Sequence, residues 1–426
     1  MTDNSALPDG AQAGAEIMVR ADAIAVHNDG AQGVTRRFLS SQHRAAADMI
    51  IGWMRDAGMD DVWLDNAGNV VGRYEGAEPG LPALITGSHQ DTVSEGGRYD
   101  GMLGVLTPIA CVAAMSERGE RLPYAIEVVA IGDEEGLRFN TGLFGSQALA
   151  GALEPSELSK SDSNGVTVAQ ALRDFDLDPD AIGAVARRPE DVLAYVELHI
   201  EQGPILEAEG LAMGVVTAIT GSINLTVTIN GTAGHAGTVP MTRRNDALAA
   251  AAEAILAVER NCSGQEGLVG TVGTISVGPD ATNVIPGVVR FSVDLRSGDA
   301  GRRATAVTGI KADIAAICER RRVTADIENL GESTGCACAP WLMDQLETAV
   351  TDEGLPPRRL FSGAGHDAQA MNALTDVGML FLRCKAGVSH NPDEAITAED
   401  AGTGVRVMLR FLRSFKKKNA LENESV

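Results

Sequence analysis

The sequence predicts an α/β protein of two domains, in which a smaller α+β module interrupts an α/β/α layer domain. First, the chain of 426 residues is longer than one hydrophobic core of ordinary size accommodates. Second, apolar strands alternate with helices over residues 1–216 and again over 331–426, which is typical of an α/β domain. Third, residues 217–330 change to strands of period-two alternation, which indicates an inserted module.

The first part of the layer domain begins with helices. Over residues 16–60, apolar residues recur at helical spacing up to a C-cap at Gly58. Residues 62–76 are predicted to be a hairpin, because Asn66, Ala67 and Gly68 supply a turn. The polar stretch 155–190 is expected to be a surface insertion with a short helix. Three apolar strands that run into polar loops are predicted within residues 82–93, 124–136 and 194–207.

The inserted module has a recognisable element order. Alternating strands are expected at 223–234, 268–280, 287–297 and 323–331, and helices at 245–261 and 304–322. This β-α-β-β-α-β order matches a ferredoxin-like α+β module. The chain then returns to α/β character and ends with a helix at 402–415.

Composition and charge exclude several classes of protein. The formal net charge of −23 argues against nucleic acid or an anionic membrane as a partner, because both need a basic surface. No apolar run approaches the roughly 20 residues that span a bilayer. The N-terminus lacks the pattern of a secretory signal, so we expect a cytoplasmic protein whose six cysteines are reduced.

Two motifs follow predicted strands in the first part of the chain. The loop 87–101 offers His89, Asp91 and Asp100, and a mixture of imidazole and carboxylate suits a divalent metal ion. Asp91 could accept the second ring N–H of His89 and so fix its tautomer. In GDEEG, residues 132–136, one carboxylate could bind a metal while its neighbour takes a proton from water. Each motif taken alone also fits a polar surface loop.

Two further histidines complete the candidate set. His199 lies in ELHIEQGP, residues 197–204, and His390 in the loop motif AGVSHNPDE, residues 386–394. Alone, His199 fits a buried core histidine better than a ligand. Polar residues beyond the carboxyl ends of neighbouring strands meet at one edge of the sheet, so together the motifs predict one site. Five ligands are enough for two metal ions if one carboxylate bridges them.

Over residues 16–414 the sequence resembles a known family, the metal-dependent M20 amidohydrolases. Within it, the similarity is to the branch of N-carbamoyl-L-amino acid hydrolase, β-ureidopropionase and allantoate amidohydrolase. Seven motifs in one order carry the resemblance: GSHQDTVSEGGRYDG, GDEEGLRF, ELHIEQGP, GTAGHAGTVPM, TNVIPG, SGAGHDA and GVSHNPDE.

The resemblance implies two divalent metal ions per subunit, zinc or manganese, with cobalt also suitable. His89 and His199 would hold one ion, and Glu135 and His390 the other. Asp100 would bridge them.

The resemblance also implies the groups that act on the substrate. Glu134 would be the general base that deprotonates the bridging water and passes the proton to the leaving nitrogen. In this family the inserted module mediates dimerisation and closes over the site. His235 would reach the site of the partner in a homodimer and stabilise the oxyanion.

The implied substrate contacts come from several motifs. Arg296 would pair with the substrate carboxylate and Asn283 would contact its carboxylate or amide. Gln202 would orient the substrate, and Gly363 and Gly365 would line the pocket by close backbone approach. His366 and Asp367 either support the loop of Gly363 and Gly365 or support the metal ligands, and the sequence does not separate these roles.

The activity that we expect is hydrolysis of the ureido (N-carbamoyl) C–N bond of a small carboxylate, with release of ammonia and carbon dioxide. Allantoate is the favoured substrate, because Arg383 precedes the His390 loop, although Arg383 also fits a surface salt bridge. An N-carbamoyl-L-amino acid hydrolase or a β-ureidopropionase is the alternative. An M20 peptidase or N-acyl-amino-acid deacylase, and a metal-binding scaffold without activity, are more distant alternatives.

Overall fold

A computed structural model describes residues 7–265 and 267–418 of the chain. Its contacts divide the chain into two compact units. Unit 1 runs to Thr217 and resumes over Cys338–Leu360 and from His366 onward, and unit 2 is Ala218–Ala337 with Phe361–Gly365. The short segment Phe361–Gly365 groups with unit 2, although the sequence pattern placed it with the last part of the layer domain. The main-chain N–H of Thr220 donates a hydrogen bond to the carbonyl of Ser362 at 3.0 Å, which attaches this segment.

Unit 1 is built on a mixed sheet with the strand order β1-β2-β4-β3-β5-β16-β6, in which β15 also pairs with β6. The central strands β4, β3, β5 and β16 are parallel to one another. Strands β1 and β2 run antiparallel to their neighbours, and β6 is antiparallel to β16. Every residue of β3, β4 and β16 is buried, as expected for strands covered on both faces. The strands are β1 (Asp61–Leu64), β2 (Val70–Tyr74), β3 (Ala83–His89), β4 (Ala125–Ile131), β5 (Val192–Ile200), β6 (Met213–Ile219), β15 (Arg359–Ser362) and β16 (Val377–Leu382).

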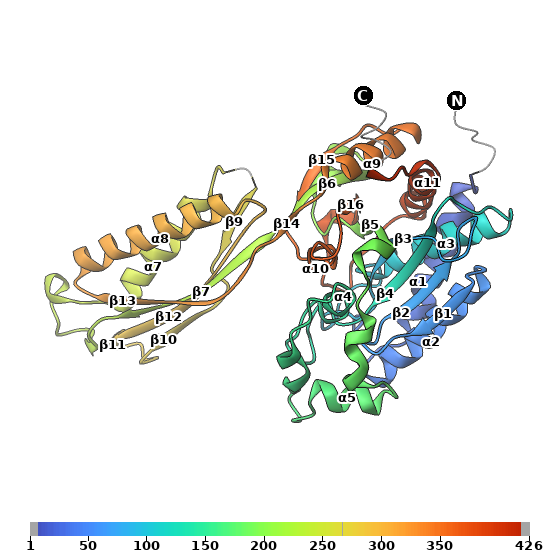
Figure 1. The fold of residues 1–426 in the computed structure, drawn as a ribbon. Helices are drawn as coiled ribbons and strands as arrows, with labels where there is room; N and C mark the ends of the chain where they lie inside the picture. The colour runs from blue at the N-terminus through green and yellow to red at the C-terminus, as the bar shows by residue number, and fades with distance from the viewer. Residues whose placement is uncertain (1–6, 266, 419–426) are drawn as a thin grey trace. The chain divides into compact units, whose positions relative to one another are not determined.

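Helices of unit 1 pack on this sheet and on one another (Figure 1). The first and last long helices, α1 and α11, pack closely because glycine residues lie at their contact. A Cβ atom on Gly14 would lie 1.8 Å from the carbonyl oxygen of Ala398, and one on Gly402 would lie 1.9 Å from that of Gly10. The helices are α1 (Gly10–Ala25), α2 (Ser41–Asp56), α3 (Met102–Ser116), α4 (Phe144–Leu149), α5 (Val168–Asp174), α6 (Ile205–Glu209), α9 (Pro340–Asp352), α10 (Ala368–Met371) and α11 (Ala398–Ser414).

Several elements that the sequence predicted are confirmed. The hairpin is β1–β2, the short helix of the 155–190 insertion is α5, and the last helix is α11. The expected helical region 16–60 is two helices separated by an irregular segment. The second of them, α2, begins only after Ser40, because the Ser40 hydroxyl accepts a hydrogen bond from the N–H of His43 and caps the helix.

Unit 2 is an antiparallel sheet with the order β10-β12-β7-β13, and β9 also pairs with β12. Two helices, α7 and α8, lie side by side on one face of it (Figure 1). Leu225 and Val227 of the sheet and Ala250 and Ile310 of the helices belong to the core between them. The elements are β7 (Gly221–Asn230), β8 (Gly234–His235), α7 (Ala247–Cys262), β9 (Leu268–Thr271), β10 (Ile275–Gly278), β11 (Val284–Ile285), β12 (Val288–Ser297), α8 (Ala300–Arg321), β13 (Thr324–Ser333) and β14 (Cys336–Ala337).

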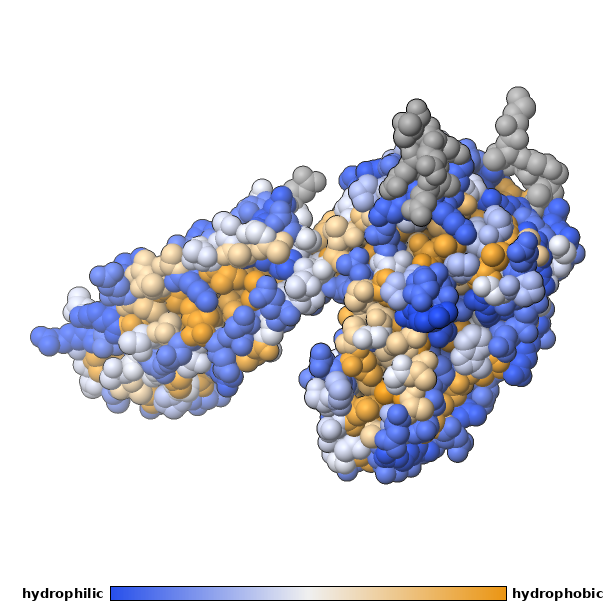
Figure 2. Space-filling view, viewed as in Figure 1, coloured by the Kyte–Doolittle hydropathy of each residue, from blue (hydrophilic) through white to orange (hydrophobic). Residues whose placement is uncertain are grey.

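Apolar side chains reach the surface of unit 2 where its helices meet its sheet (Figure 2). The exposed large ones include Leu256, Val269 and Ile275, each about half exposed. Within residues 7–265 and 267–418, no helix is both long enough and apolar enough to cross a membrane.

His43 lies fully buried in an aromatic cluster of unit 1. Its ring is 5.4 Å from that of Phe38 and 5.5 Å from that of Phe175, measured between centroids. Among the described residues, neither ring nitrogen has a hydrogen-bond partner. Burial, and then the charges of Arg36 and Arg138, lower the pKa of His43 to about 3. The folded protein therefore holds His43 neutral over a pH range in which the unfolded chain protonates it.

We expect the stability of the chelator-treated protein to fall as pH drops from about 6.5 toward 3, by up to about 1.4 kcal/mol per pH unit from His43 alone. The His43→Phe variant should lack this component, because it fills the aromatic cluster without a titrating group. Thermal unfolding of both proteins across this pH range measures the difference. His27→Gln, at a partly exposed histidine, is the control. Parallel pH profiles for wild type and His43→Phe would show that His43 does not contribute.

Candidate metal centre

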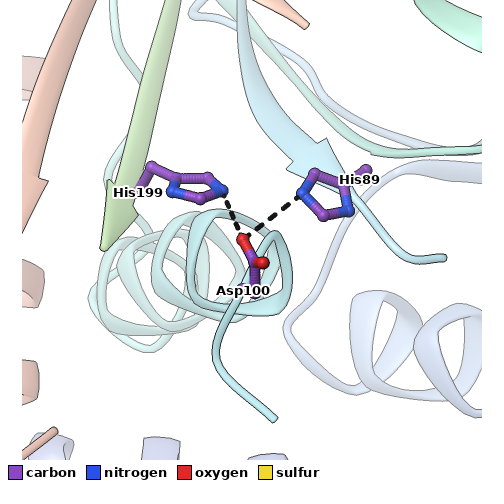
Figure 3. A group of neighbouring side chains, drawn as sticks. All are labelled: His89, Asp100 and His199. Carbon is purple, nitrogen blue, oxygen red and sulfur yellow. Dashed lines mark ion pairs between the residues drawn. The ribbon is translucent and has the colours of Figure 1, made fainter. Parts of the chain in front are cut away.

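His89, Asp100 and His199 converge at the carboxyl end of the parallel strands of unit 1 (Figure 3). His89 ends β3, His199 lies near the end of β5, and Asp100 precedes α3. Asp100 Oδ1 lies 3.1 Å from Nε2 of His199 and 3.8 Å from Nε2 of His89. All three residues are buried. The sheet thus brings together three metal-ligand atoms from separate parts of the sequence.

Main-chain carbonyls orient both imidazoles. The Nδ1 atom of His89 is 2.9 Å from the carbonyl oxygen of Asp91, and Nδ1 of His199 is 2.9 Å from that of Ile200. A carbonyl only accepts, so each Nδ1 carries the proton. In the neutral rings Nε2 is therefore the nitrogen with a lone pair, and it lies toward Asp100. In His199 this atom also accepts a hydrogen bond from the N–H of Gly101 at 3.2 Å. This is the tautomer that a metal ligand needs.

A second set of ligand atoms lies on the other side of the same carboxylate. His390 Nε2 is 3.2 Å from Asp100 Oδ2 and 3.5 Å from Glu135 Oε1. Each oxygen of Asp100 thus faces a different histidine-containing group. The ligand atoms within each of the two groups, His89–Asp100–His199 and Asp100–Glu135–His390, all lie within 4.8 Å of one another. Imidazole and carboxylate donors of this kind suit divalent metal ions, and Asp100 belongs to both groups.

The carboxylate of Asp91 holds the acidic loop rather than the ring of His89. It accepts hydrogen bonds from the N–H groups of Glu134 and Glu135, at 3.0 and 3.2 Å. Its nearer oxygen is 3.9 Å from His89 Nδ1, which bonds instead to the Asp91 carbonyl. The second ring N–H of His89 is therefore placed against the main chain of Asp91, and its carboxylate lies 3.9 Å away.

Excess negative charge is buried at this site. Burial raises the pKa of Glu135 to about 7, and Asp100 adds to the rise against the opposing effect of His89. Burial likewise raises the pKa of Glu134 well above its ordinary value, with a contribution from Glu135. Burial alone would also raise the pKa of Asp100, but hydrogen bonds with His199 and His390 bring it well below the ordinary value. Carboxylates crowded in this way favour a bound cation.

Gln202 contacts the ligands directly. Its Nε2 donates to both oxygens of Asp100, at 3.2 and 3.3 Å, and lies 3.3 Å from Nε2 of His390. The structure therefore places this residue, for which the resemblance implies a substrate contact, against the shared carboxylate.

The other residues with an implied role toward the substrate belong to unit 2. They are His235, Asn283, Arg296, Gly363 and Gly365. The exposed His235 on β8 accepts a hydrogen bond at Nδ1 from the N–H of Gly237, so its neutral ring carries the proton on Nε2. The carbonyl of Asn283 accepts from the N–H of Ala236, which brings Asn283 beside His235.

Arg296, on β12, is held from two sides within unit 2. Its Nε and Nη2 donate to the carboxylate of Asp294, and its Nη1 donates to the carbonyl of Gly363 at 3.2 Å. Gly365 belongs to the same short segment as Gly363. A Cβ on Gly363 would meet nothing within 4 Å, so the chain itself does not require glycine there.

Three buried residues extend the site behind His199. The Glu197 carboxylate accepts hydrogen bonds from the Ser88 hydroxyl at 2.6 Å and from the N–H of Ala368 at 3.2 Å. The ring of His366 packs edge-on against His199, with centroids 4.6 Å apart, and Asp367 is fully buried beside them. Their positions in ELHIEQGP and SGAGHDA were visible in the sequence, but their burial behind one ligand was not.

Arg383 is a structural residue. It donates two hydrogen bonds, at 2.9 and 2.8 Å, to the carboxylate of Asp400, which is buried in the first turn of α11. Of the two interpretations of Arg383, the structure supports the salt bridge. All six cysteines are buried, and none belongs to a disulfide between described residues.

Comparison with known proteins identifies the family. The sequence pattern of Peptidase family M20/M25/M40 matches residues 85–414. The chain belongs to this family. It is 42% identical to an N-carbamoyl-L-amino acid amidohydrolase of Geobacillus stearothermophilus, over 88% of this chain and 92% of that protein. It is 40% identical to a probable allantoate deiminase of Oryza sativa subsp. japonica, over 93% of this chain and 87% of that protein.

A solved structure shows the same mixed α/β fold. The crystal structure of an amidase of the hydantoinase/carbamoylase family from Burkholderia multivorans superimposes with a TM-score of 0.88 at 33% identity. The match covers 94% of this chain and 97% of that one.

Metal binding should stabilise the protein through Asp100. We expect Zn²⁺ or Mn²⁺, added to chelator-treated protein, to stabilise it by about 2.7 kcal/mol at a free concentration 100 times Kd. The Asp100→Asn variant should lose most of this gain, because it removes the charge that both ligand groups share. Thermal unfolding with and without metal measures the gain. Asp180→Asn, at an acid whose side chain is 87% exposed, is the control. An equal gain in Asp100→Asn would contradict the shared-ligand arrangement.

Proposed function

We propose that this chain hydrolyses the ureido (N-carbamoyl) C–N bond of a small carboxylate and releases ammonia and carbon dioxide. The observation that carries the proposal is the division of the Asp100 carboxylate between two histidine-containing ligand groups, with Glu134 beside them. Relatives named for amidohydrolase and deiminase activity support the reaction class.

Allantoate is the substrate that we propose, with an N-carbamoyl-L-amino acid or N-carbamoyl-β-alanine as the alternative. Relatives named as allantoate deiminases support this choice. The relatives named for the first two activities are similar to the chain to nearly the same degree, 40% and 42%. Since Arg383 pairs with Asp400, it no longer favours allantoate. A peptidase or N-acyl-amino-acid deacylase uses the same kind of centre and differs in its leaving group.

The residues of the centre fit two divalent metal ions, Zn²⁺ or Mn²⁺, with Co²⁺ also suitable. His89 and His199 would hold one, Glu135 and His390 the other, and Asp100 both. When bound, such ions lower the pKa of water and polarise the carbonyl that is attacked.

Glu134 is the general base in this proposal. Its main chain is held by the Asp91 carboxylate, and burial with Glu135 nearby raises the pKa of its own carboxyl group. A raised pKa suits a group that takes a proton from the attacking water and then gives it to the leaving nitrogen.

Unit 2 supplies substrate recognition and dimerisation in this proposal. It would be a ferredoxin-like lid in which His235 donates its Nε2–H to the oxyanion of the partner subunit's substrate, while Asn283 and Arg296 bind the carboxylate end. The fixed tautomer of His235 supports the donor role. Leu248 and Leu256 are exposed eight residues apart on α7, so they share one helix face, which supports a homodimer.

A substrate screen tests the activity. Metal-reconstituted protein should release ammonia from allantoate faster than from N-carbamoyl amino acids or N-carbamoyl-β-alanine, and should not cleave N-acyl amino acids. The Glu134→Gln variant should lose roughly 100- to 10,000-fold in kcat while it keeps its metal, because only the proton acceptor is lost. Full activity in Glu134→Gln, or cleavage of acyl but not ureido substrates, would refute the proposal.

Mixing two inactive variants tests whether His235 acts across the dimer. When Glu134→Ala and His235→Ala are mixed in equal amounts and their subunits exchange, about half of the dimers contain one subunit of each kind. Each mixed dimer then has one intact site of two, so the mixture should regain about a quarter of wild-type activity. If His235 acts within its own subunit, every site of a mixed dimer has one defect and no activity returns. Glu134→Ala mixed with Glu134→Gln is the control.

A further inference from the structure

Glu394 ends the GVSHNPDE motif, four residues after His390, and the proposed reaction gives it no role. It is buried, with an exposed fraction of 3%. Its Oε1 accepts hydrogen bonds from the N–H groups of Tyr99 and Asp100, at 2.9 and 3.1 Å. Its Oε2 accepts one from the Ser389 hydroxyl at 3.1 Å. One carboxylate therefore joins the loop that carries Asp100 to the loop that carries His390.

The Asp100 loop is shaped to receive this carboxylate. A Cβ on Gly97 would lie 2.1 Å from both Cδ and Oε1 of Glu394. On the neighbouring Gly96, a Cβ atom would have the Val93 side chain as its nearest contact, at 3.0 Å. Glycine at position 97 is thus explained by close approach to Glu394.

Gln202 also joins these two loops, because its Nε2 contacts Asp100, Ser389 and His390. Glu394 differs in that it holds the main chain of the Asp100 loop. His89 and His199 are positioned by neighbouring strands of the sheet, but Asp100 and His390 lie in loops. His390 also has a left-handed backbone, with φ of 54°. Ser389 lies within hydrogen-bonding distance of both Glu394 and Asp100 Oδ2, at 3.1 and 3.3 Å. Glu394 therefore helps to set the separation of Asp100 from His390, together with Ser389 and Gln202.

The described partners of Glu394 are two main-chain amides and a hydroxyl, with no cationic side chain among them. A buried carboxylate without such a partner is costly unless another positive charge compensates it. Asp100 lies directly beside it, so a cation bound there supplies this compensation.

We propose that Glu394 is a positioning residue for the metal centre, which sets the distance between Asp100 and His390 and favours a cation between them. The inference rests on the proposed metal-dependent function. It predicts that loss of the Glu394 charge weakens metal binding without weakening the metal-free fold.

The test compares Glu394→Gln with Asp393→Asn, which neutralises the adjacent exposed acid. Zn²⁺ affinity is measured by competition with a chromophoric chelator, and the metal-free melting temperature is measured in parallel. We expect Glu394→Gln to bind Zn²⁺ about 10- to 100-fold more weakly, the range found for groups that support ligands. Its metal-free melting temperature should equal or exceed that of wild type, because an uncompensated buried charge is removed. Gly97→Ala should weaken Zn²⁺ binding similarly, by displacing Glu394.

The outcomes separate this inference from the function on which it rests. If wild type binds no Zn²⁺ or Mn²⁺, the metal-dependent function itself is refuted. If wild type binds Zn²⁺ and Glu394→Gln binds it as tightly as Asp393→Asn does, only the positioning role is refuted. A lower metal-free melting temperature in Glu394→Gln with unchanged Zn²⁺ affinity would show a purely structural residue and would equally refute it.

Discussion

The site of this protein depends on one carboxylate that faces two ways. Asp100 Oδ1 points to His89 and His199, and Oδ2 points to His390. Because a carboxylate has two oxygens at a fixed separation, one residue can set the distance between two ligand groups. Around it, Gln202 and Glu394 approach the same residue through its side chain and main chain. The arrangement therefore fails as a whole if Asp100 moves.

Strained backbone surrounds this carboxylate. Glu95, Asp133, Gln202 and His390 are not glycine, yet each has a positive φ, between 52° and 62°. Each such conformation costs of order 1 kcal/mol and persists only where neighbouring contacts hold it. For Glu95 these contacts are visible, since its carboxylate accepts hydrogen bonds from the N–H groups of Ala31, Gln32 and Gly33. The turns after the strands are thus held in the shapes that aim the ligand side chains.

The sequence predicted the parts of this site that depend on regular structure. His89, Glu135 and His199 follow apolar strands, and parallel strands necessarily bring their carboxyl ends together. The sequence did not predict the contacts that main-chain atoms make. For example, His89 bonds to the main-chain carbonyl of Asp91 and not to the Asp91 carboxylate. This choice depends on the geometry of the loop, which the residue types do not specify.

Long-range pairings were equally hard to predict. The Arg383–Asp400 salt bridge and the attachment of residues 361–365 to unit 2 both depend on how separate segments meet in space. Glu394 lies within a recognised motif, but only its contact with the main chain of Asp100 suggests a role for it. The catalytic and substrate-binding roles remain predictions.

The contact between Glu394 and Asp100 joins residues 294 positions apart in the chain. During synthesis, which proceeds from the N-terminus, most of the ligands emerge from the ribosome well before His390 and Glu394 do. A nascent chain can fold unit 2 from largely local segments while its metal site is still incomplete. The group of side chains around Asp100 is therefore complete only when nearly the whole chain has been synthesised, which makes it one of the last parts of the protein to take its final form.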